Sequence, residues 1–119
     1  MSLHLFAGLR VRDFQAARPW YELLLGEPAF FPHATEAVWT LDEDRSVYVI
    51  EHPEGAGGSV VTIFLDDLDA HIDAVAARGL EPDELETYAN GVRKAVYRDR
   101  DGNEVGFGGA RSDTGVRRG

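Results

Sequence analysis

Histidines and carboxylates are the side chains of this sequence that could bind a metal ion or transfer a proton. The chain has no cysteine, and its four histidines are widely spaced, at His4, His33, His52 and His71. Glu51 and His52 are adjacent, but neighbours in a strand point to opposite faces of a sheet. Local spacing therefore predicts no metal site. The lack of cysteine also excludes disulfides, thiolate ligands and a cysteine nucleophile.

Glycine-rich and basic segments could bind phosphate or another anion. The segment Gly55–Gly58 lacks the preceding strand and following helix that would aim backbone amides at a phosphate, so we interpret it as a linker. No nucleophile elbow or dinucleotide fingerprint is present. Arg10, Arg93 and Lys94 could meet an anionic ligand, or could be solubilising charges at the sheet edges.

Aromatic residues gather on the predicted strands and their ends. They are Phe6, Phe30, Phe31, Trp39, Tyr48, Phe64 and Tyr88. Strand alternation predicts that Phe6, Thr62 and Phe64 share an inner face. Aromatic walls with a few polar groups are typical of small-molecule pockets, although the same residues could simply pack a core. Trp20 and Tyr21, at helical spacing from Leu24 and Leu25, are assigned to the core.

The first half of the chain predicts a strand, a helix and three further strands. A strand over 3–11 is followed by Asp13, whose carboxylate suits a helix N-cap, and the helix runs to Leu25 before Gly26. Pro19 predicts a kink or a late helix start. Strands are expected at 29–31, with prolines on both sides, and at 37–41 and 46–51.

The same pattern restarts after the glycine-rich segment. A strand over 60–65 leads to a helix that starts at the acidic residues Asp66, Asp67 and Asp69 and ends at Arg78 and Gly79. Three strands follow, at 81–88, 92–97 and 104–108. Asp67 lies 54 positions after Asp13, at the corresponding strand-to-helix junction. The chain therefore reads as a βαβββ unit that occurs twice.

Three groups of residues together carry a family resemblance. They are the junctions Val11-Arg12-Asp13 and Leu65-Asp66-Asp67, the helix from Phe14 through Trp20-Tyr21 to Gly26, and the turn Asp99-Arg100-Asp101-Gly102-Asn103. Together they resemble the vicinal oxygen chelate superfamily, which includes glyoxalase I, bleomycin-resistance proteins and extradiol dioxygenases.

The resemblance implies an α+β fold with one domain over 1–109. Two βαβββ modules, at about 3–54 and 58–109, would form an open, curved mixed sheet around a ligand cup. The helices would lie on the outer face of this sheet, and 110–119 would form a flexible tail.

The resemblance also implies four metal ligands on strands, which hold a divalent cation for catalysis. The first, third and fourth positions match Phe6, Val60 and Gly106, whose side chains cannot coordinate a metal. The second matches Glu51, and one carboxylate is too few ligands for a catalytic site. A shift of two residues on the first strand would bring His4 to the inner face. We therefore predict no metal, no cofactor and no catalytic residue.

Composition limits the partners of this chain. Its 119 residues fit one domain, and its formal net charge of −9 argues against nucleic acid as a partner. No apolar run reaches the roughly 18 residues of a membrane span. The first six residues carry no basic segment before an apolar run, so we expect no secretory signal and a cytoplasmic protein.

The sequence favours a metal-independent small-molecule-binding protein that resembles bleomycin-resistance proteins, with a cationic aromatic ligand. The expected contacts are the aromatic residues Phe6, Trp39, Tyr48 and Phe64, together with Thr62 and, facing the positive charge, Glu51. Small members of the family commonly pair, so we expect a homodimer. The alternatives are a metal-dependent enzyme of the glyoxalase or dioxygenase type, and a regulatory or structural partner domain whose cup is filled.

Overall fold

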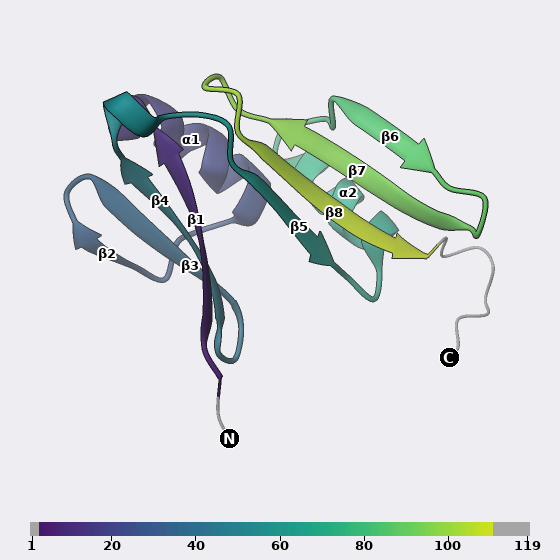
Figure 1. The fold of residues 1–119 in the computed structure, drawn as a ribbon. Coiled ribbons are helices and arrows are strands. Elements are labelled where there is room, and N and C mark those ends of the chain that lie inside the picture. The colour runs from purple at the N-terminus through teal and green to yellow at the C-terminus, as the bar shows by residue number, and fades with distance from the viewer. Residues whose placement is uncertain (1–2, 111–119) are drawn as a thin grey trace. The chain divides into compact units, whose positions relative to one another are not determined.

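The computed structural model describes residues 3–110, which fall into two compact units (Figure 1). Unit 1 runs to Ser59 and also includes the turn Asp99–Asn103, whereas unit 2 comprises Val60–Arg98 and the residues from Glu104 onward. Residues 111–119 of the expected tail lie outside the described part, and Ala110 ends the last strand.

Unit 1 is a four-stranded mixed sheet with one α-helix and one short 3-10 helix. Its elements are β1 (Leu5–Val11), α1 (Phe14–Leu25), β2 (Phe30–His33), β3 (Glu36–Asp42), β4 (Arg45–Glu51) and a short 3-10 helix at Pro53–Gly55. The strand order is β1-β4-β3-β2. Strand β1 runs parallel to β4, and the other pairs are antiparallel.

One face of this sheet forms the core of unit 1 together with α1. Leu9 and Val11 of β1 are fully buried, as are Phe14 and Tyr21 of α1. Asp13 caps the helix as predicted, since its carboxylate accepts a 3.2 Å hydrogen bond from the amide of Ala16. This capping fixes where the helix leaves the sheet.

Two prolines lie inside elements that the sequence analysis expected them to interrupt or delay. The late start expected from Pro19 does not occur, because α1 begins at Phe14 and contains Pro19. The sequence predicts a strand at 29–31 that ends before Pro32, yet β2 extends to His33 and includes this proline. Strand β2 is an edge of its sheet, where a missing amide donor need not cost a ladder hydrogen bond.

Unit 2 repeats the arrangement. Its elements are β5 (Val60–Phe64), α2 (Leu68–Ala77), β6 (Glu84–Thr87), β7 (Val92–Arg98) and β8 (Glu104–Ala110), with strand order β5-β8-β7-β6. Asp67 caps α2 through the amide of Ala70 at 3.0 Å. The helix packs on β8, as Figure 1 shows. The α+β fold of two βαβββ modules is thereby confirmed, with each module forming a four-stranded mixed sheet of its own.

Unit 2 packs a histidine of its helix against the sheet. The ring centroid of His71, on α2, lies 4.2 Å from that of Phe107, on β8, and the Nε2 atom of His71 is buried. Burial, and then the nearby charge of Arg78, lower the pKa of His71. No helix within residues 3–110 is long and apolar enough to cross a membrane.

Candidate functional site

The face of the unit 1 sheet opposite α1 carries exposed aromatic side chains. Phe6 and Gly8 of β1 alternate with the core residues Leu9 and Val11, so they lie on this face. Gly8 is paired with Tyr48 of the neighbouring strand β4. Phe6 is 54% exposed, and its ring centroid lies 6.4 Å from that of Tyr48, at an interplanar angle of 55°. The two rings form an aromatic surface that borders solvent.

Trp39 lies on the opposite, helix-covered face of this sheet. It is 2% exposed, its Nε1 atom donates a 2.8 Å hydrogen bond to the carbonyl of Gly26, and its ring lies 6.2 Å from that of Tyr21. This environment leaves the indole no surface that a ligand could reach within unit 1. We therefore leave Trp39 out of the candidate surface.

Glu51 also lies on the helix side of the sheet. It pairs with Val11 in the parallel β1–β4 ladder, and its Oε1 atom accepts a 3.0 Å hydrogen bond from the amide of Phe14. That amide is one of the free donors at the start of α1. Glu51 thus has a structural role at the helix N-terminus, and it does not share a face with Phe6.

The corresponding face of unit 2 carries Thr62 and Phe64, as strand alternation predicted for this pair. They are paired with Gly106 and Gly108 of β8. Phe64 is 72% exposed. The stem of Lys94 covers Gly106, because a Cβ atom added to that glycine would lie 2.7 Å from Cε of the lysine. This face therefore combines an exposed ring with a hydroxyl and an ammonium group.

Charged residues of β6, β7 and β8 lie on the same face of the unit 2 sheet as Phe64. Glu86 lies opposite Lys94 in the β6–β7 ladder and accepts a 2.7 Å hydrogen bond from the hydroxyl of Tyr88. That hydrogen bond lowers the pKa of Glu86 and raises the pKa of Tyr88. Arg98 pairs with Glu84 at 2.9 Å and with Glu104 at 3.5 Å.

The residues at the expected metal-ligand positions do not fit a metal. Phe6, Val60 and Gly106 offer no donor atom, and Glu51 lies on the helix side of its sheet. Within residues 3–110, no group of three or more His, Cys, Asp or Glu side chains could hold a metal ion. His4 precedes β1 and pairs with Asp44 at 2.9 Å. This donor set does not match the three or more ligands of a catalytic centre.

The Asp99–Asn103 turn contributes a buried polar network to unit 1. Asp99 accepts hydrogen bonds from the hydroxyl of Tyr21 at 2.7 Å and from the side-chain amide of Asn103 at 2.9 Å. Asn103 also donates to the carbonyl of Arg10 at 2.7 Å and accepts from the amide of Ser59 at 3.1 Å. Burial, and then the Asp99 charge, raise the pKa of Tyr21 far above its ordinary value. The motif that carried the family resemblance thus has a structural role here.

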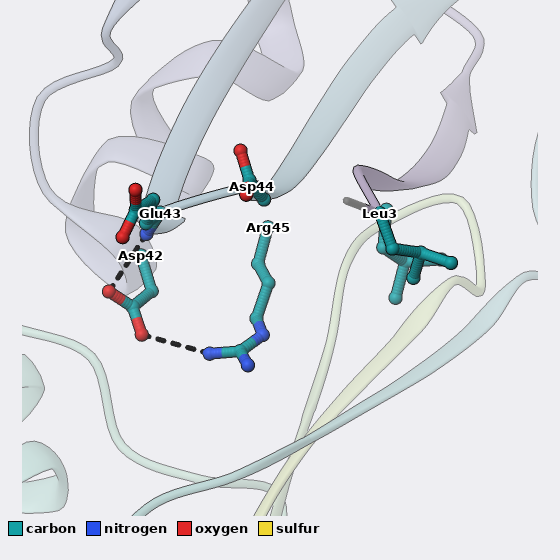
Figure 2. Close-up of a pocket in the computed structure, with 6 residues that line it drawn as sticks. Leu3, Asp42, Glu43, Asp44 and Arg45 are labelled. Atoms are coloured by element: carbon teal, nitrogen blue, oxygen red, sulfur yellow. Dashed lines mark hydrogen bonds and ion pairs between the residues drawn. The ribbon is translucent and has the colours of Figure 1, made fainter. Parts of the chain in front are cut away.

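One pocket of unit 1 lies at the β3–β4 turn (Figure 2), and its volume is about 470 Å³. It is lined by Leu3, Leu5, Asp42, Glu43, Asp44 and Arg45. The carboxylate of Asp42 already accepts hydrogen bonds from the Glu43 amide and from Arg45, at 2.8 Å and 2.9 Å. Because the one cationic side chain of this lining, Arg45, is already paired with Asp42, we do not assign a ligand to this pocket.

Two glycines that face aromatic rings were missed in the sequence analysis. Gly8 and Gly108 lie inside strands, opposite Tyr48 and Phe64. A glycine inside a strand often marks a close approach of another group, and this signal was available in the sequence. The partner strand could not be deduced, because the pairings join residues 40 or more positions apart.

A family model and a solved structure both relate this chain to the glyoxalase and bleomycin resistance proteins. The family model described as Glyoxalase/Bleomycin resistance protein/Dioxygenase superfamily matches residues 2–107. A solved glyoxalase / bleomycin resistance protein from Catenulispora acidiphila DSM 44928 is 53% identical, with a TM-score of 0.88, and the match covers 92% of this chain and 100% of that chain. No curated protein gives a match.

Two more distant solved structures share the fold. A bleomycin-binding protein complexed with bleomycin is 20% identical, with a TM-score of 0.72, over 92% of this chain and 100% of that one. A lactoylglutathione lyase from Agrobacterium tumefaciens is 18% identical, with a TM-score of 0.70, over 92% of this chain and 94% of that one. At these identities the likeness describes the fold alone.

Proposed function

Because this chain belongs to the glyoxalase/bleomycin resistance protein/dioxygenase superfamily, we propose that it is a small-molecule-binding protein that acts without a metal. In this role it resembles the bleomycin-resistance branch, whose members hold a ligand without changing it chemically. The exposed aromatic side chains of the sheets are the observation that carries the proposal. Phe6 is 54% exposed and Phe64 is 72% exposed.

Exposed phenylalanine rings are costly unless something covers them for part of the time. Leaving a large apolar side chain in water forfeits about 1.5–3 kcal/mol relative to burial. Grouped exposed apolar residues commonly mark a binding surface. In unit 1 the ligand would contact Phe6 and Tyr48, and in unit 2 it would contact Thr62 and Phe64. Each set lies on the sheet face opposite the helix of its own unit.

The chemistry of the expected metal positions supports binding without a metal. Phenylalanine, valine and glycine stand at three of the four positions, and the fourth residue, Glu51, accepts a hydrogen bond from the start of α1. A metalloenzyme would need other donors on the same face. The role of Glu51 in meeting a positive charge is not part of the proposal, because its carboxylate already has a backbone partner.

The ligand that fits this chain best is an aromatic cation. The formal net charge of −9 attracts cations over distances comparable to the Debye length. The bleomycin-binding protein with the same fold was crystallised with bleomycin, which makes that compound a suitable first probe. The aromatic side chains would then contact the planar part of the ligand.

The proposal is tested by isothermal titration calorimetry of the protein with metal-free bleomycin and with the planar cation proflavine. We expect saturable binding of at least one of them, and a loss of about tenfold in affinity for Phe6→Ala, since one aromatic contact is worth up to about 1.5 kcal/mol. Phe31→Ala is the matched control, because Phe31 is also exposed but its ring stacks under Arg18 at 4.4 Å.

Calorimetry is preferable to tryptophan emission, because both tryptophans pack against Tyr21 rather than on the candidate surface. Trp39 is buried beside this ring, and Trp20 contacts it in an edge-to-face arrangement. Binding that is equally weakened by Phe6→Ala and Phe31→Ala would remove Phe6 from the site. Elemental analysis provides the second test. Tight retention of about one divalent ion per chain, with turnover that is lost on chelation, would replace this proposal with a metalloenzyme.

We further propose that the protein forms a homodimer. Strands β1 and β5 are sheet edges, and they carry Leu5 and Val60, which are 60% and 65% exposed. Exposed apolar edge strands tend to be covered by another chain. Sedimentation velocity should give a dimer that Leu5→Lys weakens, whereas the same change at Leu41, on an inner strand, should leave it intact. A monomer at every concentration would refute the proposal.

A further inference from the structure

In unit 1 the ring of Tyr48 lies directly on Gly8. A Cβ atom added to Gly8 would lie 2.5 Å from Cζ, 2.6 Å from Oη and 2.9 Å from Cε1 of Tyr48. If the Cβ lay in the plane of the ring, beside its edge, it would be closer to Oη and Cε1 than to Cζ, which is bonded to both. The distances instead place the missing Cβ over the face of the ring. Tyr48 therefore lies flat on β1, in space that only a glycine leaves free.

In unit 2 the ring of Phe64 has the same relation to Gly108. A Cβ atom added there would lie 2.9 Å from Cε2 and 3.2 Å from both neighbouring ring atoms, Cδ2 and Cζ. Both neighbours are equally far and only slightly farther than Cε2, which places this Cβ above Cε2, because beside the ring edge the two neighbours would be clearly farther than Cε2. Phe64 thus lies face-down on its glycine, and with 72% of the residue exposed its other face borders solvent.

From these contacts we infer that Gly8 and Gly108 are positioning residues that hold Tyr48 and Phe64 flat on their sheets, so that each ring presents a face to a planar aromatic ligand. The inference rests on the proposed binding function and specifies its ligand class. A ring held flat can stack with a planar group over its whole face, in the offset geometry that aromatic pairs prefer. A ring that stood upright on the sheet would present an edge.

Phe6 completes the surface of unit 1. Its ring is tilted by 55° to that of Tyr48, with 6.4 Å between the centroids. A planar ligand stacked on Tyr48 would therefore meet a tilted ring at its side, in the edge-to-face arrangement that is also favourable. The sites differ in chemistry, since in unit 2 the stem of Lys94 lies over Gly106 in place of a second ring.

The test is a double-mutant cycle read by calorimetry with proflavine as the probe. We expect Gly8→Ala to weaken proflavine binding by about tenfold, the value of one stacking contact, because the new methyl group displaces the ring of Tyr48. In a Tyr48→Leu background the same change should have no further effect. A merely structural role of Gly8 would weaken binding equally in both backgrounds, and that result would overturn the inference.

Ligand shape supplies a second readout. Tetrabutylammonium is a cation without a ring, so Gly8→Ala should leave whatever affinity it has unchanged. If Gly8→Ala does not fold, as judged by circular dichroism and urea unfolding, the cycle is run with Gly108→Ala and Phe64→Leu in unit 2. Equal loss for both probes would refute the inference.

The outcomes separate this inference from the proposed function. If the wild-type protein binds neither proflavine nor bleomycin, both fail. If it binds bleomycin or proflavine but Gly8→Ala and Gly108→Ala leave the affinity unchanged, the positioning role fails and the binding function stands.

Discussion

Two buried tyrosines, Tyr21 and Tyr97, differ in whether the hydroxyl has a hydrogen-bond partner, and a change to phenylalanine at each position measures this difference. The hydroxyl of Tyr21 donates a 2.7 Å hydrogen bond to the buried Asp99 carboxylate. We expect Tyr21→Phe to lower the free energy of unfolding by about 1–3 kcal/mol, because a hydrogen bond to a charged group is lost and the carboxylate oxygen keeps only Asn103 as a donor. Urea denaturation at neutral pH measures the change.

Tyr97 is the matched control for this prediction. It is fully buried, and its hydroxyl has no hydrogen-bond partner among the described residues. Removing an unsatisfied buried hydroxyl leaves no partner stranded, so Tyr97→Phe should be neutral or stabilising. Equal destabilisation by both variants would contradict the assignment of a stabilising hydrogen bond to Tyr21.

His71 should make unit 2 less stable in mildly acidic solution. Its pKa is lowered in the folded state, so between that value and about 6.5 the unfolded chain binds more protons. The contribution of neutral His71 to the free energy of unfolding is therefore fully present above about pH 6.5, and it is lost as the pH falls toward the pKa of His71 in the folded state. We expect His71→Leu to flatten the change in unfolding free energy between about pH 7 and pH 5, as measured by urea titrations. An unchanged slope would show that other groups control it.

At the scale of elements, the connection after the 3-10 helix contains two glycines with similar backbones and different surroundings. Gly57 has φ 87° and Gly58 has φ 83°. A Cβ atom at Gly57 would collide with the carbonyl oxygen of Asp101, whereas one at Gly58 would meet nothing within 4 Å. Gly58→Ala should cost about 1–2 kcal/mol, the penalty of a left-handed backbone, and Gly57→Ala should cost clearly more.

The melting temperatures of Gly57→Ala and Gly58→Ala can be compared directly, because both variants carry the same penalty for an alanine at positive φ. The difference between them isolates the contact of Gly57 with the Asp99–Asn103 turn in unit 1. Similar melting temperatures for Gly57→Ala and Gly58→Ala would mean that the turn can move away without cost.

The helices could be predicted from sequence because their signals are local. Asp13 and Asp67 each lie three residues before the amide that they cap, and both hydrogen bonds form, at 3.2 Å and 3.0 Å. Strand faces were harder to assign. In β3 the consecutive residues Ala37, Val38 and Trp39 are all buried, so alternation of apolar and polar residues gives no phase. The sequence analysis placed Trp39 among the ligand contacts, but the pattern of β3 could not show which face of the sheet carries it.

In the molecule as a whole, the contacts that could not be predicted from the sequence join residues that are far apart in the chain. Glu51 meets the amide of Phe14, 37 positions away, and Asn103 meets the carbonyl of Arg10, 93 positions away. No local spacing encodes such partners. The same holds for Gly8, whose importance depends on Tyr48 lying in the neighbouring strand.

The net charge of the whole chain leads to a prediction about binding kinetics. With a formal charge of −9, the protein should attract proflavine from a distance, and salt should screen that attraction. We expect the association rate, measured by stopped-flow fluorescence, to fall severalfold between about 20 and 200 mM salt, while the dissociation rate changes less. An uncharged acridine serves as the control, since its association should not depend on salt. Equal salt dependence of the two ligands would mean that the acidic surface does not steer the cation, and that apolar contact alone governs its capture.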